Sequence, residues 1–224
     1  MNDNAPLWRS EGLFVTQQAL QSSEWQAASQ AIIQAGRFLN QRGWVPATSS
    51  NFSVRLTNGE IAITASGYHK GALTEASVMR IDALGKPLED RRPSAETLLH
   101  TAIYQRFAEV GAVLHTHSVN ATVLSRLHQT QLVFEDYELL KAFSGVDTHE
   151  TRMIVPIFPN DQDIARLGKV IDNWMDAHPP IHGYLIAGHG LYTWGRDMQD
   201  TLRHIEAFEF LFECELTTLK VKRS

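Results

Sequence analysis

The sequence contains very little cysteine, because Cys214 is the single one among its 224 residues. One cysteine cannot form an intrachain disulfide, and it cannot build a zinc site from several thiolates. Cys214 falls within the apolar pattern of the last predicted helix, where we expect a small core residue. The sequence therefore excludes a disulfide framework and a thiolate zinc cage.

Long apolar runs and an excess of positive charge are also missing. No stretch approaches the roughly 18 apolar residues that cross a bilayer. The N-terminal segment lacks the basic start and apolar core of a secretory signal. The net charge is −5, and no basic stripe indicates nucleic acid. We therefore expect a cytoplasmic protein without a membrane or nucleic-acid partner. A small anionic substrate stays open, since local donors decide its binding.

No repeat, low-complexity tract or break in composition divides the chain. An apolar content of 43% suits one globular domain with a sizeable core. We expect an N-terminal extension over residues 1–21, partly loose at its end, followed by one domain over residues 22–224.

Strand and helix patterns alternate along this domain. Ser23 and Gln26 resemble a capping box that begins a helix ending near Gly43. Asn58-Gly59 favours a tight hairpin between two strands, because both residues tolerate positive φ. The strands are predicted at 52–56, 61–65, within 77–89 (a strand and a turn), 112–118, 153–158, 183–188 and 191–194. The helices are predicted at 94–109, 120–127, 138–143, 161–178 (capped by Asn160 or Asp161) and 197–220. We expect an α/β fold with a mixed, largely antiparallel sheet covered by helices.

Two histidines close the apolar run AVLHTHS, and a third lies in LIAGHGL. Alternate side chains of a strand share a face, so His115 and His117 point the same way and offer half of a divalent-metal site. With His189, three nitrogens and an open fourth position are typical of a catalytic zinc site. Alternatively, some of these rings are only hydrogen-bonded near the core. The other histidines lack metal-like spacing and are expected to be structural or exposed: His69, His100, His128, His149, His178, His182 and His204.

Two carboxylates are candidates for acid–base chemistry. Glu96 lies at the start of a predicted helix in PSAETLLH, where the helix dipole alone favours an acid. Glu138 lies in FEDYELLKAF among other acids, and a solvated helix face explains it equally well. Spacing by itself does not bring either acid to the histidines.

Three turns rich in small residues could together hold a phosphate, although no glycine-rich loop with lysine is present. They are ATSSN at 47–51, ASG at 65–67 and PSAE at 93–96. Backbone N–H groups, hydroxyls and a helix N-terminus bind phosphate, but such residues are also ordinary in turns. Lys70 could add a cation, or it could be a surface lysine.

Five segments occur in the order found in the class II aldolase family, the zinc-dependent sugar-phosphate aldolases and epimerases. They are SSNFSVR, ITASG, PSAETLLH, AVLHTHS and AGHGLYTWG, and the resemblance runs from about residue 25 to residue 220. Within this family, YELLKAFSGV and PIFPNDQDIARL are most similar to the dehydratases of methionine salvage. Those enzymes remove water from a methylthio-substituted ketose 1-phosphate.

The resemblance implies roles by position. His115, His117 and His189 would bind Zn²⁺. Glu96 matches the catalytic base of the sugar-phosphate aldolases, and Glu138 matches the general acid/base of the dehydratases. The residues that match phosphate-binding turns are Ser50, Asn51, Ser66, Gly67 and Ser94. Members usually form fourfold assemblies with sites at subunit junctions, so a homotetramer is implied.

Two other activities fit the same resemblance. An aldolase or epimerase acting on a ketose 1-phosphate or pentose phosphate would use the same metal. Against an aldolase, Ser50 stands where many aldolases have glycine, and Ala95 where they have a second serine. The adducin-like members are non-catalytic interaction domains without a full histidine set, so the intact triad disfavours that reading. We therefore expect a zinc-dependent dehydratase with a small phosphorylated sugar as substrate.

Overall fold

A mixed sheet organises the computed structural model, which describes residues 8–222. Within those residues it has eight strands in the order β3-β2-β1-β4-β8-β7-β6-β5, and every pair is antiparallel except β6 with β7. The bounds are β1 Asn51–Arg55, β2 Ile61–Thr64, β3 Val78–Ile81, β4 Ala112–Thr116, β5 Gln131–Glu135, β6 Arg152–Phe158, β7 Gly183–Ile186 and β8 Gly190–Gly195. The predicted α/β fold with a largely antiparallel sheet is confirmed.

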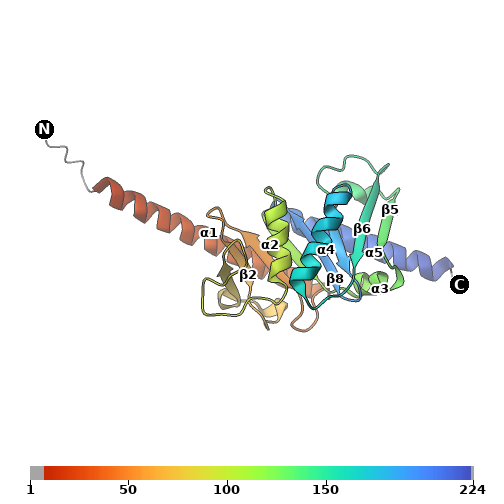
Figure 1. Cartoon of the computed structure of the whole chain (residues 1–224), viewed down its shortest axis with the longest axis horizontal. Coiled ribbons are helices and arrows are strands. Elements are labelled where there is room, and N and C mark those ends of the chain that lie inside the picture. Colours follow the sequence, from red (N-terminus) through yellow and green to blue (C-terminus); the bar gives the residue numbers. More distant parts are fainter. Residues whose placement is uncertain (1–7, 223–224) are drawn as a thin grey trace.

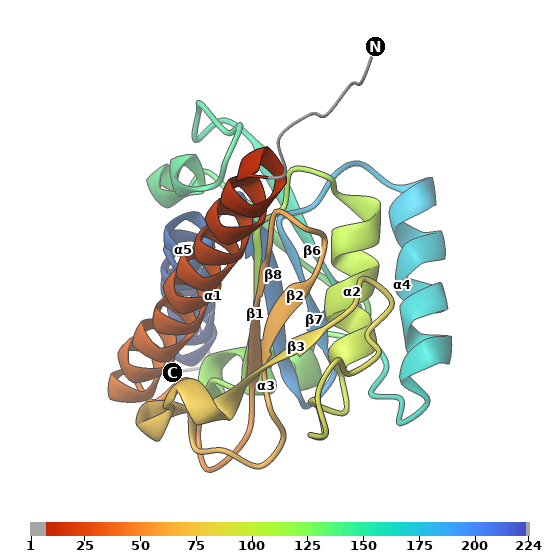
Figure 2. The same ribbon diagram turned by 90° about the vertical axis from the view of Figure 1, so that its left-hand side faces the viewer.

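Helices cover both faces of the sheet (Figure 2). One apolar cluster joins the sheet to α1, α3 and α5, and the other joins it to α2 and α4. The bounds are α1 Trp8–Gln41, α2 Thr97–Arg106, α3 Val119–Leu127, α4 Ile164–Ala177 and α5 Met198–Lys222, with 3₁₀ turns η1 Lys70–Ala72, η2 Glu75–Ser77 and η3 Glu138–Ala142. Because β4 is central, Leu114 packs in the first cluster and Val113 in the second. The alternation of side chains therefore turns His115 toward the α2 face.

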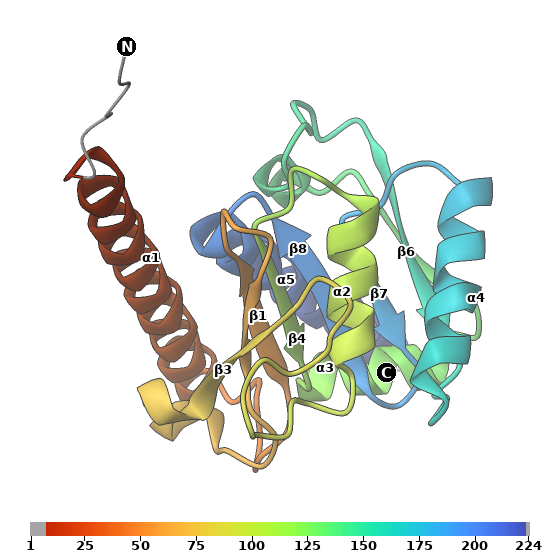
Figure 3. The same ribbon diagram turned by 60° about the vertical axis from the view of Figure 1, so that its left-hand side comes forward.

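Helix α1 begins earlier than the sequence pattern predicts. Ser23 does not cap it, because its hydroxyl donates to Leu20 O at 2.8 Å inside the helix. The predicted capping box is wrong. The division at residues 21 and 22 falls within α1 and stays a prediction, and residues 1–7 lie outside the described part. At 34 residues, α1 is about 51 Å long, and its N-terminal part extends away from the sheet (Figures 1 and 3).

Local details also differ from expectation. Helix α4 is capped by Asp163, which accepts from Arg166 N at 3.0 Å, and not by Asn160 or Asp161. In the β1–β2 hairpin only Gly59 has positive φ (86°), so the connection is longer than a tight two-residue turn. Strand β5 has no counterpart in the prediction. In the described chain, no helix combines the length and apolarity needed to cross a bilayer.

Candidate active site

Three histidines converge where β4 ends and β7 turns into β8. His115 lies within β4, His117 directly follows that strand, and His189 lies in the β7–β8 turn. One ring nitrogen from each falls within 4.8 Å of the other two. Gly190 permits this approach, because a Cβ there would lie 1.9 Å from Thr116 O. The sequence pattern therefore brings together residues that are more than seventy positions apart.

The donor set fits a metal ion. His115 Nδ1 donates to Leu191 O at 2.9 Å, so its Nε2 is unprotonated, and that atom lies 3.3 Å from His189 Nε2. Two nitrogens at zinc–ligand distances of about 2.0–2.1 Å in a tetrahedron would be about 3.3 Å apart. Burial lowers the pKa of His115 to about 4 and that of His117 to about 3. Both rings are thus neutral at pH 7, as ligation requires.

Glu96 completes the histidine cluster. It occupies the N-cap position of α2 but makes no side-chain cap hydrogen bond within the described chain. Instead, its Oε2 lies 3.2 Å from His115 Nε2 and its Oε1 lies 3.0 Å from His189 Nε2. Burial alone would raise the pKa of Glu96. The two imidazoles and the Tyr192 hydroxyl outweigh burial and lower it well below its usual range. Helix capping therefore does not explain this carboxylate.

The three small-residue turns lie side by side next to this cluster. Asn51 Nδ2 donates to Ser94 Oγ at 3.0 Å, joining the first turn to the third. Ala65 forms an antiparallel bridge with Pro93, joining the second to the third. Lys70, three residues after the second turn, donates from Nζ to Thr48 O of the first turn at 3.2 Å. The fold thus gathers hydroxyls, backbone N–H groups and a cation into one cradle that suits a phosphate.

Lys70 is not a surface lysine, because it is only 1% exposed. Its Nζ also donates to Tyr68 O at 2.7 Å, and burial lowers its pKa to about 8. The two carbonyls use two of the three ammonium donors, which leaves one for an anion.

Ser50 shows why glycine suits its position. Its φ is +74°, a left-handed conformation that strains a residue with a Cβ. Its Oγ is buried and has no hydrogen-bond partner among the described residues. Ser66 and Gly67 are exposed and form the outer part of the cradle.

Glu138 lies away from the histidines of its own chain. It is at the start of η3 with a side chain 72% exposed, paired with Lys141 and 3.6 Å from His149. Glu135, at the end of β5 that leads to Glu138, pairs with Arg152 at the start of β6. Phe158 lies six residues further along β6, at the end of that strand beside the His189 turn. Six strand residues span roughly 20 Å. Its role stays a prediction, and within one chain it cannot touch the histidines.

Sequence reasoning missed two residues at the site. Tyr192 is paired with His115 in the β4–β8 register, stacks on it at 4.0 Å and donates to Glu96 Oε2 at 2.6 Å. His100 is fully buried one helical turn after Glu96. The spacing of four residues in PSAETLLH was the available signal for His100, since such residues share a helix face.

Comparison with known proteins places the chain in a family. The family described as Class II Aldolase and Adducin N-terminal domain matches residues 30–216. This chain belongs to the class II aldolase family. The resemblance in the five segments is thereby confirmed.

Relatives within this family are similar over most of their length. A methylthioribulose-1-phosphate dehydratase from Pseudomonas syringae pv. tomato is 65% identical over 84% of this chain and 93% of its own. One from Methylococcus capsulatus is 54% identical over 91% of this chain and 100% of its own. Among solved structures, L-fuculose-1-phosphate aldolase from Thermus thermophilus matches with a TM-score of 0.67 and 25% identity, over 86% of this chain and 94% of that chain.

Proposed function

We propose that this class II aldolase family member is a cytoplasmic, zinc-dependent methylthioribulose-1-phosphate dehydratase of methionine salvage. The observation that carries the proposal is the convergence of His115, His117 and His189 beside Glu96. The name shared by the two curated relatives supports the substrate. The product is the 2,3-diketo-5-methylthiopentyl 1-phosphate.

The three imidazoles would hold the ion, and a bound zinc would supply Lewis-acid polarisation of the substrate carbonyl. The phosphate lies in the cradle, where Lys70 and the unpartnered Ser50 hydroxyl face it with Asn51, Ser66, Gly67 and Ser94. Phosphate binding there orients C3 and C4 of the sugar toward the histidine cluster, a positioning effect that lowers the barrier by itself.

Glu138 moves the proton. Its carboxylate takes the C3 proton and returns it to the C4 hydroxyl, which departs as water, leaving an enol that becomes the diketone. A placed carboxylate contributes about 10² to 10⁴ in rate. Because Glu138 lies roughly 20 Å from its own triad along the sheet, it serves the site of a neighbouring chain in a homotetramer.

Incubation of the zinc-loaded protein with methylthioribulose 1-phosphate tests the reaction. Mass spectrometry should show loss of one water from the substrate. Cleavage into dihydroxyacetone phosphate and an aldehyde would instead establish an aldolase, the alternative activity within the family. Absence of both products would contradict the proposal.

Mixed assemblies test the placement of Glu138. His115→Ala and Glu138→Gln chains should each be inactive alone. Co-expressed with different affinity tags and purified through both, they should regain activity, because some junctions then pair an intact triad with an intact Glu138. If doubly purified assemblies stay inactive while both single variants are folded and tetrameric, Glu138 does not act across a junction.

A further inference from the structure

A seam of polar residues connects α2 to β1 in the middle of an otherwise apolar cluster. On α2, Glu96, His100 and Tyr104 recur every four residues, and on β1, Asn51 and Ser53 are two residues apart. Four helical residues advance about 6.0 Å and two strand residues about 6.6 Å. The two repeats have nearly the same length, so each of the three residues on the helix side lies next to Asn51 or Ser53 on the strand.

Hydrogen bonds in this seam run in one direction. Asn51 Nδ2 donates to Glu96 Oε2 at 3.0 Å, which leaves Asn51 Oδ1 against His100 Nε2. The amide cannot be reversed, because a carboxylate only accepts. His100 Nε2 must therefore carry a proton.

The other ring nitrogen fixes the rest of the seam. With Nε2 protonated in a neutral ring, His100 Nδ1 can only accept, so the Ser53 hydroxyl donates to it at 2.7 Å. Ser53 Oγ then accepts from the Tyr104 hydroxyl at 2.9 Å. The donors run from Tyr104 through Ser53, His100 and Asn51 to Glu96.

Burial keeps these groups in the required protonation states. His100 and Ser53 are 0% exposed and Tyr104 is 5% exposed. Burial outweighs the attraction of Glu96 and lowers the pKa of His100 to about 3, so the ring is neutral at pH 7. Burial also raises the pKa of Tyr104 well above its usual value, which keeps its proton available for donation.

We propose that His100 is a positioning residue for the reaction, which acts through Asn51 to fix the orientation of the Glu96 carboxylate. The inference rests on the proposed function, in which Glu96 lies beside the three histidines that hold the metal, and it gives Glu96 a place facing the bound substrate. Asn51 and Tyr192 both donate to Oε2, so Oε1 is the oxygen that stays directed at the His189 side of the site. Misplacing a reacting group by about 1 Å can cost about 10²-fold in rate.

A matched pair of amides tests this role. In His100→Gln the amide nitrogen reaches the position of Nε2 and still donates to Asn51. In His100→Asn it reaches only the position of Nδ1, beside Ser53. We expect kcat to fall about 100-fold in H100N and less than tenfold in H100Q, with KM changed less than threefold and zinc content unchanged in both. Equal losses of kcat in the two variants would show that His100 only fills space.

The tautomer gives a readout that needs no substrate. In the NMR spectrum of ¹⁵N-histidine-labelled zinc protein at pH 7, His100 should be a neutral ring protonated at Nε2. Its signal is assigned as the one that is absent from H100Q or, if H100Q does not fold, as the one that is perturbed in Ser53→Ala. A ring protonated at Nδ1, or at both nitrogens, would overturn the proposal. If the wild-type protein removes no water from methylthioribulose 1-phosphate while this tautomer is found, the proposed function fails and the positioning of Glu96 stands.

Discussion

Two buried histidines contact opposite ends of strand β8, and their rings do different work. His115 Nδ1 donates to Leu191 O at 2.9 Å, and His204 Nδ1 donates to Trp194 O at 2.8 Å. Burial lowers the pKa of both rings. Each ring therefore has an unprotonated Nε2. The two ends of β8 differ in the groups that lie next to this nitrogen.

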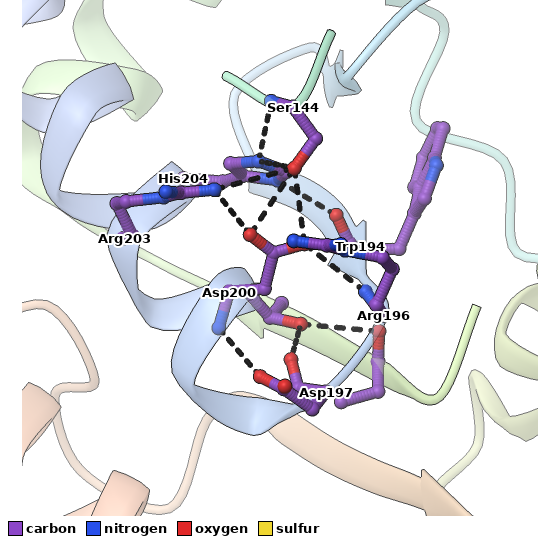
Figure 4. A network of polar contacts seen from close by, with 9 residues as sticks. Ser144, Trp194, Arg196, Asp197, Asp200, Arg203 and His204 are labelled. Atoms are coloured by element: carbon purple, nitrogen blue, oxygen red, sulfur yellow. Dashed lines mark hydrogen bonds and ion pairs between the residues drawn. The ribbon is translucent and has the colours of Figure 1, made fainter. Parts of the chain in front are cut away.

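At the His204 end, the polar groups satisfy one another (Figure 4). His204 Nε2 accepts from Ser144 N at 3.2 Å. Asp200 accepts from Ser144 Oγ at 3.1 Å, from Arg196 N at 3.2 Å and from the Arg203 guanidinium. This network ties the loop after η3 to β8 and α5 and makes that end of the sheet a structural support.

At the His115 end, the polar groups do not all satisfy one another. His115 Nε2 faces a second imidazole, and the buried hydroxyl of Ser50 has no hydrogen-bond partner in the described part of the chain. Buried polar atoms are nearly always paired, so an unpaired hydroxyl beside three clustered histidines favours a binding site there. Similar residues thus make a structural support at one end of β8 and the candidate active site at the other.

The largest effect should come from removing one histidine at each end. His115→Ala should lose the bound zinc and essentially all activity while remaining folded, because the triad loses a ligand. His204→Ala is the matched control. It should keep one zinc per chain. Its free energy of unfolding should be lower by about 2 kcal/mol, because the buried partners of His204 are left without hydrogen bonds. Metal analysis and urea unfolding check both. Zinc retained in H115A would break the comparison.

Lys70→Met should mainly weaken substrate binding. Loss of a charged donor from the cradle costs about 2–3 kcal/mol, so KM should rise about 30- to 160-fold with a smaller change in kcat. Lys86→Met removes an exposed lysine and serves as the control. Steady-state kinetics with methylthioribulose 1-phosphate measure both constants, and an unchanged KM in K70M would remove Lys70 from the phosphate site.

Asp200→Asn should affect stability and leave the chemistry intact. Burial alone would raise the pKa of Asp200, but its hydrogen bonds to Arg196 and Ser144 and the nearby cations lower it. Its stabilising contribution is therefore present above about pH 4 and is lost as pH falls further. The variant should lose about 2 kcal/mol at pH 7, and its difference from wild type should shrink as pH falls below about 4. Unfolding curves across pH test this. A difference that stays constant as pH falls through the acid range would contradict it.

The smallest effect should come from Ser50→Gly. Glycine relieves the strain of φ +74° and should stabilise the fold by about 1 kcal/mol. It also removes the unpartnered hydroxyl, so KM should rise by a few fold. Thermal unfolding and kinetics measure the two effects separately. A variant with lower stability would show that the Ser50 side chain supports the loop itself.

Local rules suffice to predict that the three histidines come together, while their role as metal ligands stays a prediction. The alternation of a strand sets His115 and His117 on one face, and the glycines around His189 allow its turn to approach β4. Residues recruited through strand order were missed, because pairing of β4 with β8 brings Tyr192 to His115 across 77 positions. Burial of Lys70 likewise depends on a carbonyl 22 residues away. The early start of α1 was missed because its first turns carry no cap or clear apolar period.

X-ray absorption at the zinc edge of the purified protein tests the central claim most directly. The account predicts one zinc per chain with three imidazole nitrogens at about 2.0–2.1 Å and one oxygen ligand, and loss of this signature in His115→Ala. A shell dominated by oxygen, or a sulfur ligand from Cys214, would contradict a catalytic centre built on His115, His117 and His189.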